Sequence, residues 1–113
     1  MSPIISVKDW FLLKKKYLTV NEANRIKINI QSDSMLPVFK IGEIVKIKAC
    51  LPMKIKVDDI IVYFHSEFNA TIHRVVSKFK IASKYYFRTK GDNNTCMDAY
   101  LVCEDDIIGV ADI

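Results

Sequence analysis

Three short polar segments of this 113-residue chain carry side chains suited to nucleophilic chemistry, and the first spans residues 31–37. Ser32, Asp33 and Ser34 follow an alternating stretch and precede a proline, so we expect them where a strand ends in a turn. A serine held there can expose both its hydroxyl and its own amide to a substrate carbonyl. Serine and aspartate in loops mostly serve turns, however, so this segment alone indicates no more than a turn.

The second segment, residues 71–76, places His73 on a predicted strand, on the face shared with Thr71 and Val75. A neutral imidazole is well matched to take a proton from serine, because its unperturbed pKa is about 6.5. Activity that uses this base is therefore expected to climb as the pH passes through that range. A lone histidine on a strand is more often structural. The other histidine, His65, is predicted to lie in a surface loop.

The third segment, residues 90–98, is a cluster of glycine, aspartate and asparagine after a predicted strand. Most such clusters are turns. A carboxylate from it can nevertheless orient an imidazole and stabilise the imidazolium that forms when a serine attacks.

Cys50, Cys96 and Cys103 match no zinc or redox spacing, so we expect no metal or cofactor, and free thiols in a reducing compartment.

The elements that must position these side chains are mainly strands. From residue 26 the apolar period is two, and residues 59–64 form a nearly continuous apolar run that predicts a buried strand. Strands are predicted at 26–31, 45–48, 59–64, 71–79, 85–89 and 107–111, with turns at 40–42, 58–59, 66–69 and 91–94. Short strands with close turns predict a mostly β fold, a partly closed antiparallel barrel with one short N-terminal helix.

That helix is predicted over about residues 7–18, where Ser6 and Asp9 form a capping box. Trp10 and Phe11 belong to an aromatic stripe at helical spacing, and lysines flank it. Packing of the stripe against the domain is favoured over a position on a membrane surface with the lysines toward the headgroups. Peripheral membrane or membrane-partner docking through this helix stays open as an alternative.

Composition predicts a single domain over residues 1–113, because half of the residues are hydrophobic and the length suits one core. The net charge of +4 comes from dispersed lysines, while Arg25, Arg74 and Arg88 stand far apart, so no nucleic-acid partner is expected. No run is long and apolar enough for a membrane span, and no signal peptide is recognised. The expected location is cytoplasmic or peripheral to a membrane.

Taken together and in this order, the segments resemble the catalytic domain of type I signal peptidases, whose fold is shared with self-cleaving SOS repressors. The resemblance runs from about residue 28 to 113. Five stretches carry it: Ser32-Asp33-Ser34-Met35-Leu36-Pro37 with the strand at 42–47, residues 58–64, Ile72-His73-Arg74-Val75-Val76, Lys90-Gly91-Asp92-Asn93-Asn94, and Ile107-Ile108-Gly109.

The resemblance implies a serine endopeptidase that acts on precursor or leader peptides with small side chains before the cut. It implies Ser34 as nucleophile, His73 as base and Asp98 as third member. Ser32 matches the hydroxyl that helps the amide of Ser34 form an oxyanion hole, and Asp92 matches an aspartate that shapes the site. A histidine base is typical of the endoplasmic-reticulum and archaeal branch, whereas bacterial enzymes and the repressors use lysine.

Departures from the pattern leave alternatives open. Asp33 stands where those peptidases often have glycine, Leu36 replaces a frequently polar residue, and the membrane anchor that normally precedes the nucleophile is missing. The chain is then an enzyme for soluble peptides, one that docks through a partner, or a catalytic core cut from a longer protein. The main rival reading is a non-catalytic module of the same fold that holds a peptide along a sheet edge.

Overall fold

The computed structural model describes residues 26–66 and 69–113, which form one antiparallel sheet of seven strands. The strand order is β1-β2-β7-β3-β4-β5-β6. The strands are β1 (Ile26–Asn29), β2 (Ile44–Lys48), β3 (Ile60–Ser66), β4 (Asn69–Ile81), β5 (Lys84–Lys90), β6 (Leu101–Cys103) and β7 (Ile107–Ala111). Two short 3-10 helices, η1 (Pro52–Lys54) and η2 (Glu104–Asp106), connect strands.

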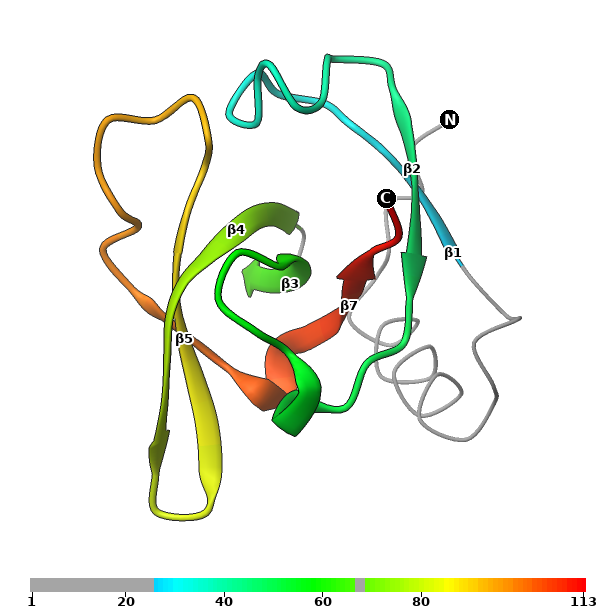
Figure 1. The fold of residues 1–113 in the computed structure, drawn as a ribbon. Coiled ribbons are helices and arrows are strands. Elements are labelled where there is room, and N and C mark those ends of the chain that lie inside the picture. The colour runs from blue at the N-terminus through cyan, green and yellow to red at the C-terminus, as the bar shows by residue number, and fades with distance from the viewer. Residues whose placement is uncertain (1–25, 67–68) are drawn as a thin grey trace.

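The prediction of a mostly β, antiparallel fold is confirmed, but the predicted partial closure into a barrel is wrong. Within the described residues β1 pairs only with β2, and β6 pairs only with β5, so the sheet has two open edges. Figure 1 shows the reason: β1 and β2 lie on one side of the central strands β3 and β7, and β5 lies on the other. The predicted N-terminal helix lies outside the described residues.

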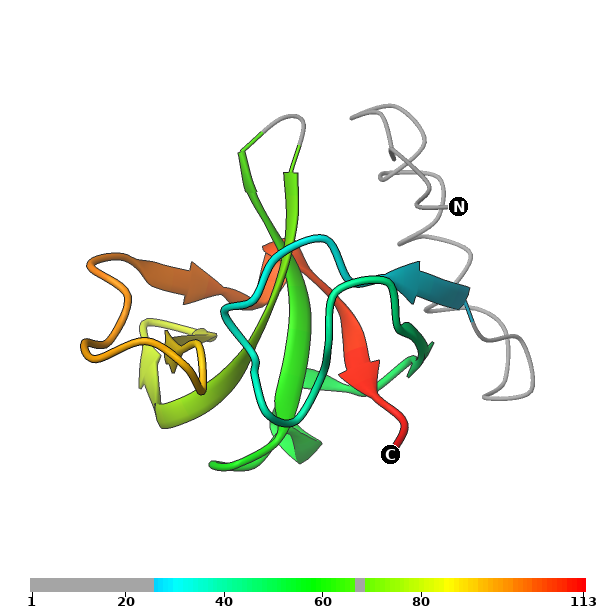
Figure 2. The same ribbon diagram turned by 90° about the horizontal axis from the view of Figure 1, so that it is seen from above.

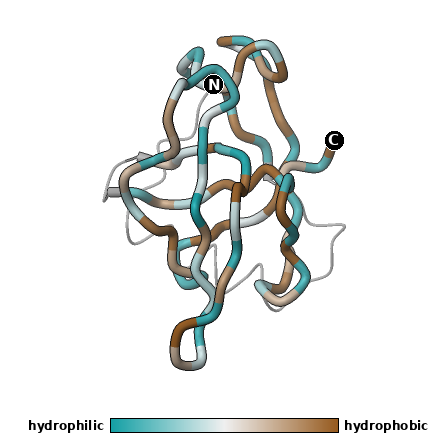
Figure 3. The backbone as a smooth tube through the Cα atoms, turned by 60° about the vertical axis from the view of Figure 1, so that its left-hand side comes forward, coloured by the Kyte–Doolittle hydropathy of each residue, from teal (hydrophilic) through white to brown (hydrophobic). Residues whose placement is uncertain are grey.

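The first half of the central strand β3, Ile60 to Tyr63, is buried on both faces, which explains its continuous apolar sequence. Ile60 and Val62 belong to a first core cluster with residues of β1, β2 and the 30–39 segment. Ile61 and Tyr63 belong to a second cluster with residues of β4 to β7. Hydropathy changes repeatedly along the tube, as expected where strands send alternate side chains to opposite faces (Figure 3). The prediction of a buried strand at 59–64 is therefore confirmed for residues 60–63, while Asp59 precedes the strand and Phe64 is partly buried.

The ends of several strands differ from the sequence prediction. Ser66 and Asn69 were expected in a turn but belong to β3 and β4, because their pairing prolongs the ladder; Figure 2 shows these strand ends projecting from the sheet. Strand β6 was not predicted, since three residues are too few for a clear alternation. The β4–β5 turn is Ala82–Ser83, where Ala82 has a φ of 57°.

The segment between β1 and β2 carries the first polar motif, and it is held by hydrogen bonds between its two ends and by two buried side chains. The amide of Ile30 donates to Glu43 O at 2.9 Å, and that of Gly42 donates to Ile30 O at 2.8 Å, so the two ends of the segment meet. Met35 and Phe39 are buried in the first core cluster. The loop that bears Ser34 is thus held at its base and by two buried side chains.

The described residues contain no helix with the length and hydrophobicity needed to span a membrane.

Candidate active site

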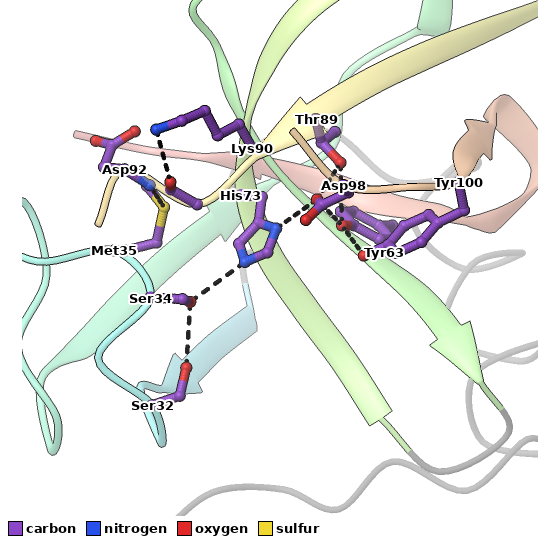
Figure 4. A network of polar contacts seen from close by, with 11 residues as sticks. Ser32, Ser34, Met35, Tyr63, His73, Thr89, Lys90, Asp92, Asp98 and Tyr100 are labelled. Atoms are coloured by element: carbon purple, nitrogen blue, oxygen red, sulfur yellow. Dashed lines mark hydrogen bonds and ion pairs between the residues drawn. The ribbon is translucent and has the colours of Figure 1, made fainter. Parts of the chain in front are cut away.

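Three parts of the fold meet around His73: the loop between β1 and β2, strand β4, and the irregular segment between β5 and β6 (Figure 4). His73 lies on β4 opposite Ile61 of β3 in the register. It is only 7% exposed, and its ring lies edge-on to that of Tyr63 in the second core cluster, whereas Ser34 is half-buried and Ser32 exposed. A buried histidine therefore reaches a partly open serine.

Ser34, His73 and Asp98 form one chain of hydrogen bonds. His73 Nε2 lies 3.2 Å from Ser34 Oγ, and His73 Nδ1 lies 2.7 Å from Asp98 Oδ2. An ionised carboxylate only accepts hydrogen bonds, so Nδ1 carries the hydrogen of the neutral ring, and Nε2 is left to accept from the serine hydroxyl. The side chains of His73 and Asp98 are 9% and 11% exposed, so their contact is largely shielded from water.

Ser32 extends this chain. Its hydroxyl oxygen lies 3.2 Å from that of Ser34. Because each hydroxyl has one hydrogen, a Ser34 that donates to His73 must accept from Ser32. Ser32 thus places a donor beside the oxygen that would attack a carbonyl.

The carboxylate of Asp98 is surrounded by hydroxyl groups. Thr89 Oγ1 donates to Asp98 Oδ2 at 2.6 Å, and the hydroxyl of Tyr63 donates to the same oxygen at 3.3 Å. The hydroxyls of Tyr63 and Tyr100 lie 2.8 Å apart. The amide of Asp98 also donates to Thr89 O at 2.8 Å, which ties the irregular segment to the end of β5.

The segment after β5 also holds the serine loop. The amide of Asn93 donates to Ser34 O at 2.8 Å, and Asn93 Nδ2 donates to Asp33 O at 3.1 Å. Gly91 permits this approach, because an added Cβ would lie 2.7 Å from Ser34 O and 3.0 Å from His73 Nε2. The backbone of Gly91 thus occupies space beside the serine and the imidazole that no other residue could share without moving them.

Asp92 points to Arg74, away from the serine and the imidazole. Arg74 Nε and Nη2 donate to its two carboxylate oxygens at 2.9 and 2.8 Å, and Arg74 Nη1 donates to Asp58 O at 2.9 Å. The hydrogen bonds from Arg74 hold the pKa of Asp92 below its ordinary value. The amide of Asp92 lies 3.3 Å from Met35 Sδ, so this residue joins the segment after β5 to β4 and to the serine loop.

Sequence reasoning missed Tyr63, Thr89 and Tyr100. One signal was available: Tyr63 stands in an otherwise apolar run, and a buried tyrosine needs a partner for its hydroxyl. His65, expected in a loop, lies in β3, where its exposed ring stacks on Tyr100 with centroids 3.8 Å apart. Among the described residues no cluster of three or more His, Cys, Asp or Glu side chains is arranged to hold a metal ion.

The arrangement has the parts needed for acyl transfer: a hydroxyl, an imidazole with a free acceptor nitrogen turned to it, and a carboxylate behind the ring. Over 80 residues the chain is 30% identical to signal peptidase I W of Bacillus subtilis (strain 168). The matched stretch covers 70% of this chain and 42% of that protein, so it spans less than half of the relative. No protein-family model matches the chain. The similarity supports a relationship to signal peptidase I, without distinguishing the branches that use histidine and lysine.

Proposed function

We propose that this chain is a serine endopeptidase of the signal peptidase I kind, which removes leader or signal segments from precursor peptides. Ser34 is the nucleophile, His73 the general base and Asp98 the carboxylate behind it. The observation that carries the proposal is the hydrogen-bonded chain from Ser34 Oγ through the imidazole to Asp98 Oδ2. The similarity to signal peptidase I W supports the proposed substrate class. A histidine in the role of base supports the endoplasmic-reticulum and archaeal branch as the kind of signal peptidase that we propose.

The proposed reaction follows from two hydrogens assigned above: the ring hydrogen of His73 on Nδ1 and the hydroxyl hydrogen of Ser34 directed to Nε2. Ser34 Oγ attacks the scissile carbonyl carbon while Nε2 of His73 takes the hydroxyl proton, and Asp98 stabilises the resulting imidazolium through Nδ1–H. The carbonyl oxygen becomes an oxyanion, which the amide of Ser34 and the hydroxyl of Ser32 bind. His73 then gives its proton to the leaving amine. Water, activated by the same imidazole, cleaves the acyl-serine and frees the nucleophile.

Incubation with synthetic precursor peptides that carry alanine before the cut tests the proposal, with products identified by mass spectrometry. Ser34→Ala and His73→Ala are each expected to abolish cleavage above background. Ser32→Ala is expected to lower kcat by about 100- to 1000-fold, the usual effect of removing one oxyanion donor. Ser83→Ala, in the β4–β5 turn, is the matched serine control and should cleave like wild type.

Two results would contradict the proposed peptidase function. If the Ser34 and His73 variants cleaved as fast as wild type, the observed activity would belong to a contaminant. If wild type bound the peptides without cleaving them, the non-catalytic peptide-binding module would replace the peptidase, since both edge strands, β1 and β6, have an unpaired side within the described sheet.

A further inference from the structure

Asp98 Oδ2 accepts hydrogen bonds from two hydroxyl groups besides the imidazole. Thr89 Oγ1 donates at 2.6 Å, His73 Nδ1 lies at 2.7 Å, and the hydroxyl of Tyr63 donates at 3.3 Å, all to the same carboxylate oxygen. Thr89 is fully buried and Tyr63 is 1% exposed. Two buried hydroxyls thus converge on the carboxylate oxygen that contacts the base, and the reaction itself uses neither.

The hydrogens of these hydroxyls can be assigned by counting, because each group has only one. Thr89 gives its hydrogen to Asp98, so at 3.2 Å from Tyr63 it can only accept. Tyr63 therefore directs its hydrogen toward Thr89 and Asp98, which leaves Tyr100 as the donor across the 2.8 Å contact. Burial raises the pKa of both tyrosines, so both keep their hydrogens. The hydrogens of Thr89 and Tyr63 thus point toward Asp98, and that of Tyr100 points toward Tyr63.

This convergence matters because Asp98 lies in an irregular segment, outside any strand. Its backbone is tied to Thr89 O, but its carboxylate could still turn about two side-chain torsions. Donors from Thr89 and Tyr63 favour the one orientation in which Oδ2 faces Nδ1 of the imidazole. That orientation selects the neutral ring with its hydrogen on Nδ1, which is the form that leaves Nε2 able to take the proton of Ser34.

We propose that Thr89 and Tyr63, supported by Tyr100, are positioning residues that orient Asp98 and so select the Nδ1–H form of His73. The inference rests on the proposed function, in which Nε2 must accept a proton from Ser34. It extends the site to Tyr63 in the middle of β3 and Thr89 near the end of β5, neither of which contributes a reacting atom.

Comparing Thr89→Val with Thr89→Ser separates the effect of the Thr89 hydroxyl on catalysis from the effect of its packing. Valine keeps the shape of threonine without a donor, whereas serine keeps the donor and loses a buried methyl group. Thr89→Val is expected to lower kcat about tenfold or more with KM nearly unchanged, because a hydrogen bond to a charged group is lost. Thr89→Ser should restore most of the rate. Tyr63→Phe should lower kcat less, since its bond to Asp98 is longer.

Nitrogen-15 NMR of the imidazoles supplies a readout that needs no peptidase activity, with His73 identified by the signals lost in His73→Ala. Wild type and Thr89→Ser should show the neutral ring protonated at Nδ1. Thr89→Val should show a mixture that includes the Nε2–H form. Tyr85→Phe, a tyrosine of β5 outside this hydroxyl group, is the control for loss of a phenol and should match wild type in both measurements.

The two proposals fail in different ways. If Thr89→Val matched wild type in kcat and in ring form while Ser34→Ala abolished cleavage, the positioning role would be wrong and the peptidase would stand. If wild type cleaved nothing, the peptidase would fail, and the NMR comparison would still decide the positioning role. A rate loss in Thr89→Val that Thr89→Ser shared would indicate packing and would overturn the role of the hydroxyl.

Discussion

Ser34 and His73 are 39 positions apart in the chain, and His73 and Asp98 are 25 apart, yet their side chains lie within hydrogen-bonding distance. The sequence analysis named these three as candidate site residues from their types and their order along the chain. The Tyr63 and Thr89 contacts to Asp98 were not predictable in that way, because no spacing rule links a tyrosine within an apolar strand to a carboxylate 35 positions later. At the scale of residues, the sequence indicated the candidate reacting groups, and their hydroxyl partners emerged only from the fold.

Gly91→Ala should impair the candidate site more than the fold. The added Cβ would meet Ser34 O and Asn94 Nδ2 at 2.7 Å and His73 Nε2 at 3.0 Å, and the first of these is backbone that cannot turn aside. Displacing the serine from the imidazole is expected to lower kcat about 100-fold, measured on the peptide substrates.

Gly42→Ala is the matched control for that substitution. Gly42 has a φ of 89°, so alanine is strained there by about 1–2 kcal/mol, but nothing lies within 4 Å of the added Cβ. This variant should lose stability and keep its kcat. Equal kcat values for Gly91→Ala and wild type would contradict the packing around the site.

Asp92→Asn should destabilise the protein at neutral pH by about 1 kcal/mol, because it breaks a partly exposed ion pair. Arg74 lowers the pKa of Asp92 from 3.8, so the carboxylate stabilises the fold above that value. This stabilisation is lost as the pH falls through the lower folded-state pKa. The stability difference between wild type and variant should therefore shrink below pH 3.8 and disappear in stronger acid.

Urea unfolding across that pH series measures the difference, and a double-mutant cycle with Arg74→Gln isolates the pair. A difference that did not change with pH would show that the ion pair is not its source.

At the scale of elements, sequence patterns located six of the seven strands, by a period of two for most of them and by a continuous apolar run for residues 59–64. Both patterns depend only on which residues face the core. Val45 and Ile47 are buried in β2 while Lys46 is exposed, as the pattern predicts. The alternation did not reveal β6, whose three residues are held by pairing with β5. Nor did it reveal the turn at Ala82, which lacks the glycine or asparagine typical of tight hairpins.

Ala82→Gly should raise stability by about 0.5–1 kcal/mol. Ala82 has a φ of 57° at the first position of the β4–β5 turn, a conformation that costs an L-residue energy and costs glycine none. The midpoint of urea unfolding measures the gain.

Ser83→Gly, at the second position of the same turn, is the control. Ser83 is not among the described residues with a positive φ, so glycine there should bring no gain. A gain of equal size at both positions would mean that relief of strain at Ala82 is not the cause.

At the scale of the whole molecule, the described residues form two core clusters that share the central strand β3. Met35 and Phe39 of the serine loop belong to the first cluster, and the His73 ring lies edge-on to Tyr63 of the second. The candidate site therefore bridges the two clusters, and its geometry depends on both. The prediction of a single domain implies that the clusters unfold together.

Phe87→Ala tests that prediction. Phe87 is fully buried in the second cluster, so its truncation is expected to cost about 3–5 kcal/mol. Amide signals from both clusters, followed by NMR through denaturation, should lose structure at one shared and lowered midpoint. Separate midpoints, with the first cluster unaffected, would divide the described residues into two units.

The sequence by itself determined the strands with clear alternation, the buried strand that begins at Ile60, and the types of side chain at the candidate site. These follow from local rules, because backbone periodicity and side-chain chemistry act within a few residues. Tertiary structure decided that the sheet stays open, that Asp92 faces Arg74, and that Thr89 and Tyr63 converge on Asp98. These depend on strand order and register, which are settled by burying both faces of β3 at once, and no short stretch of sequence encodes that balance.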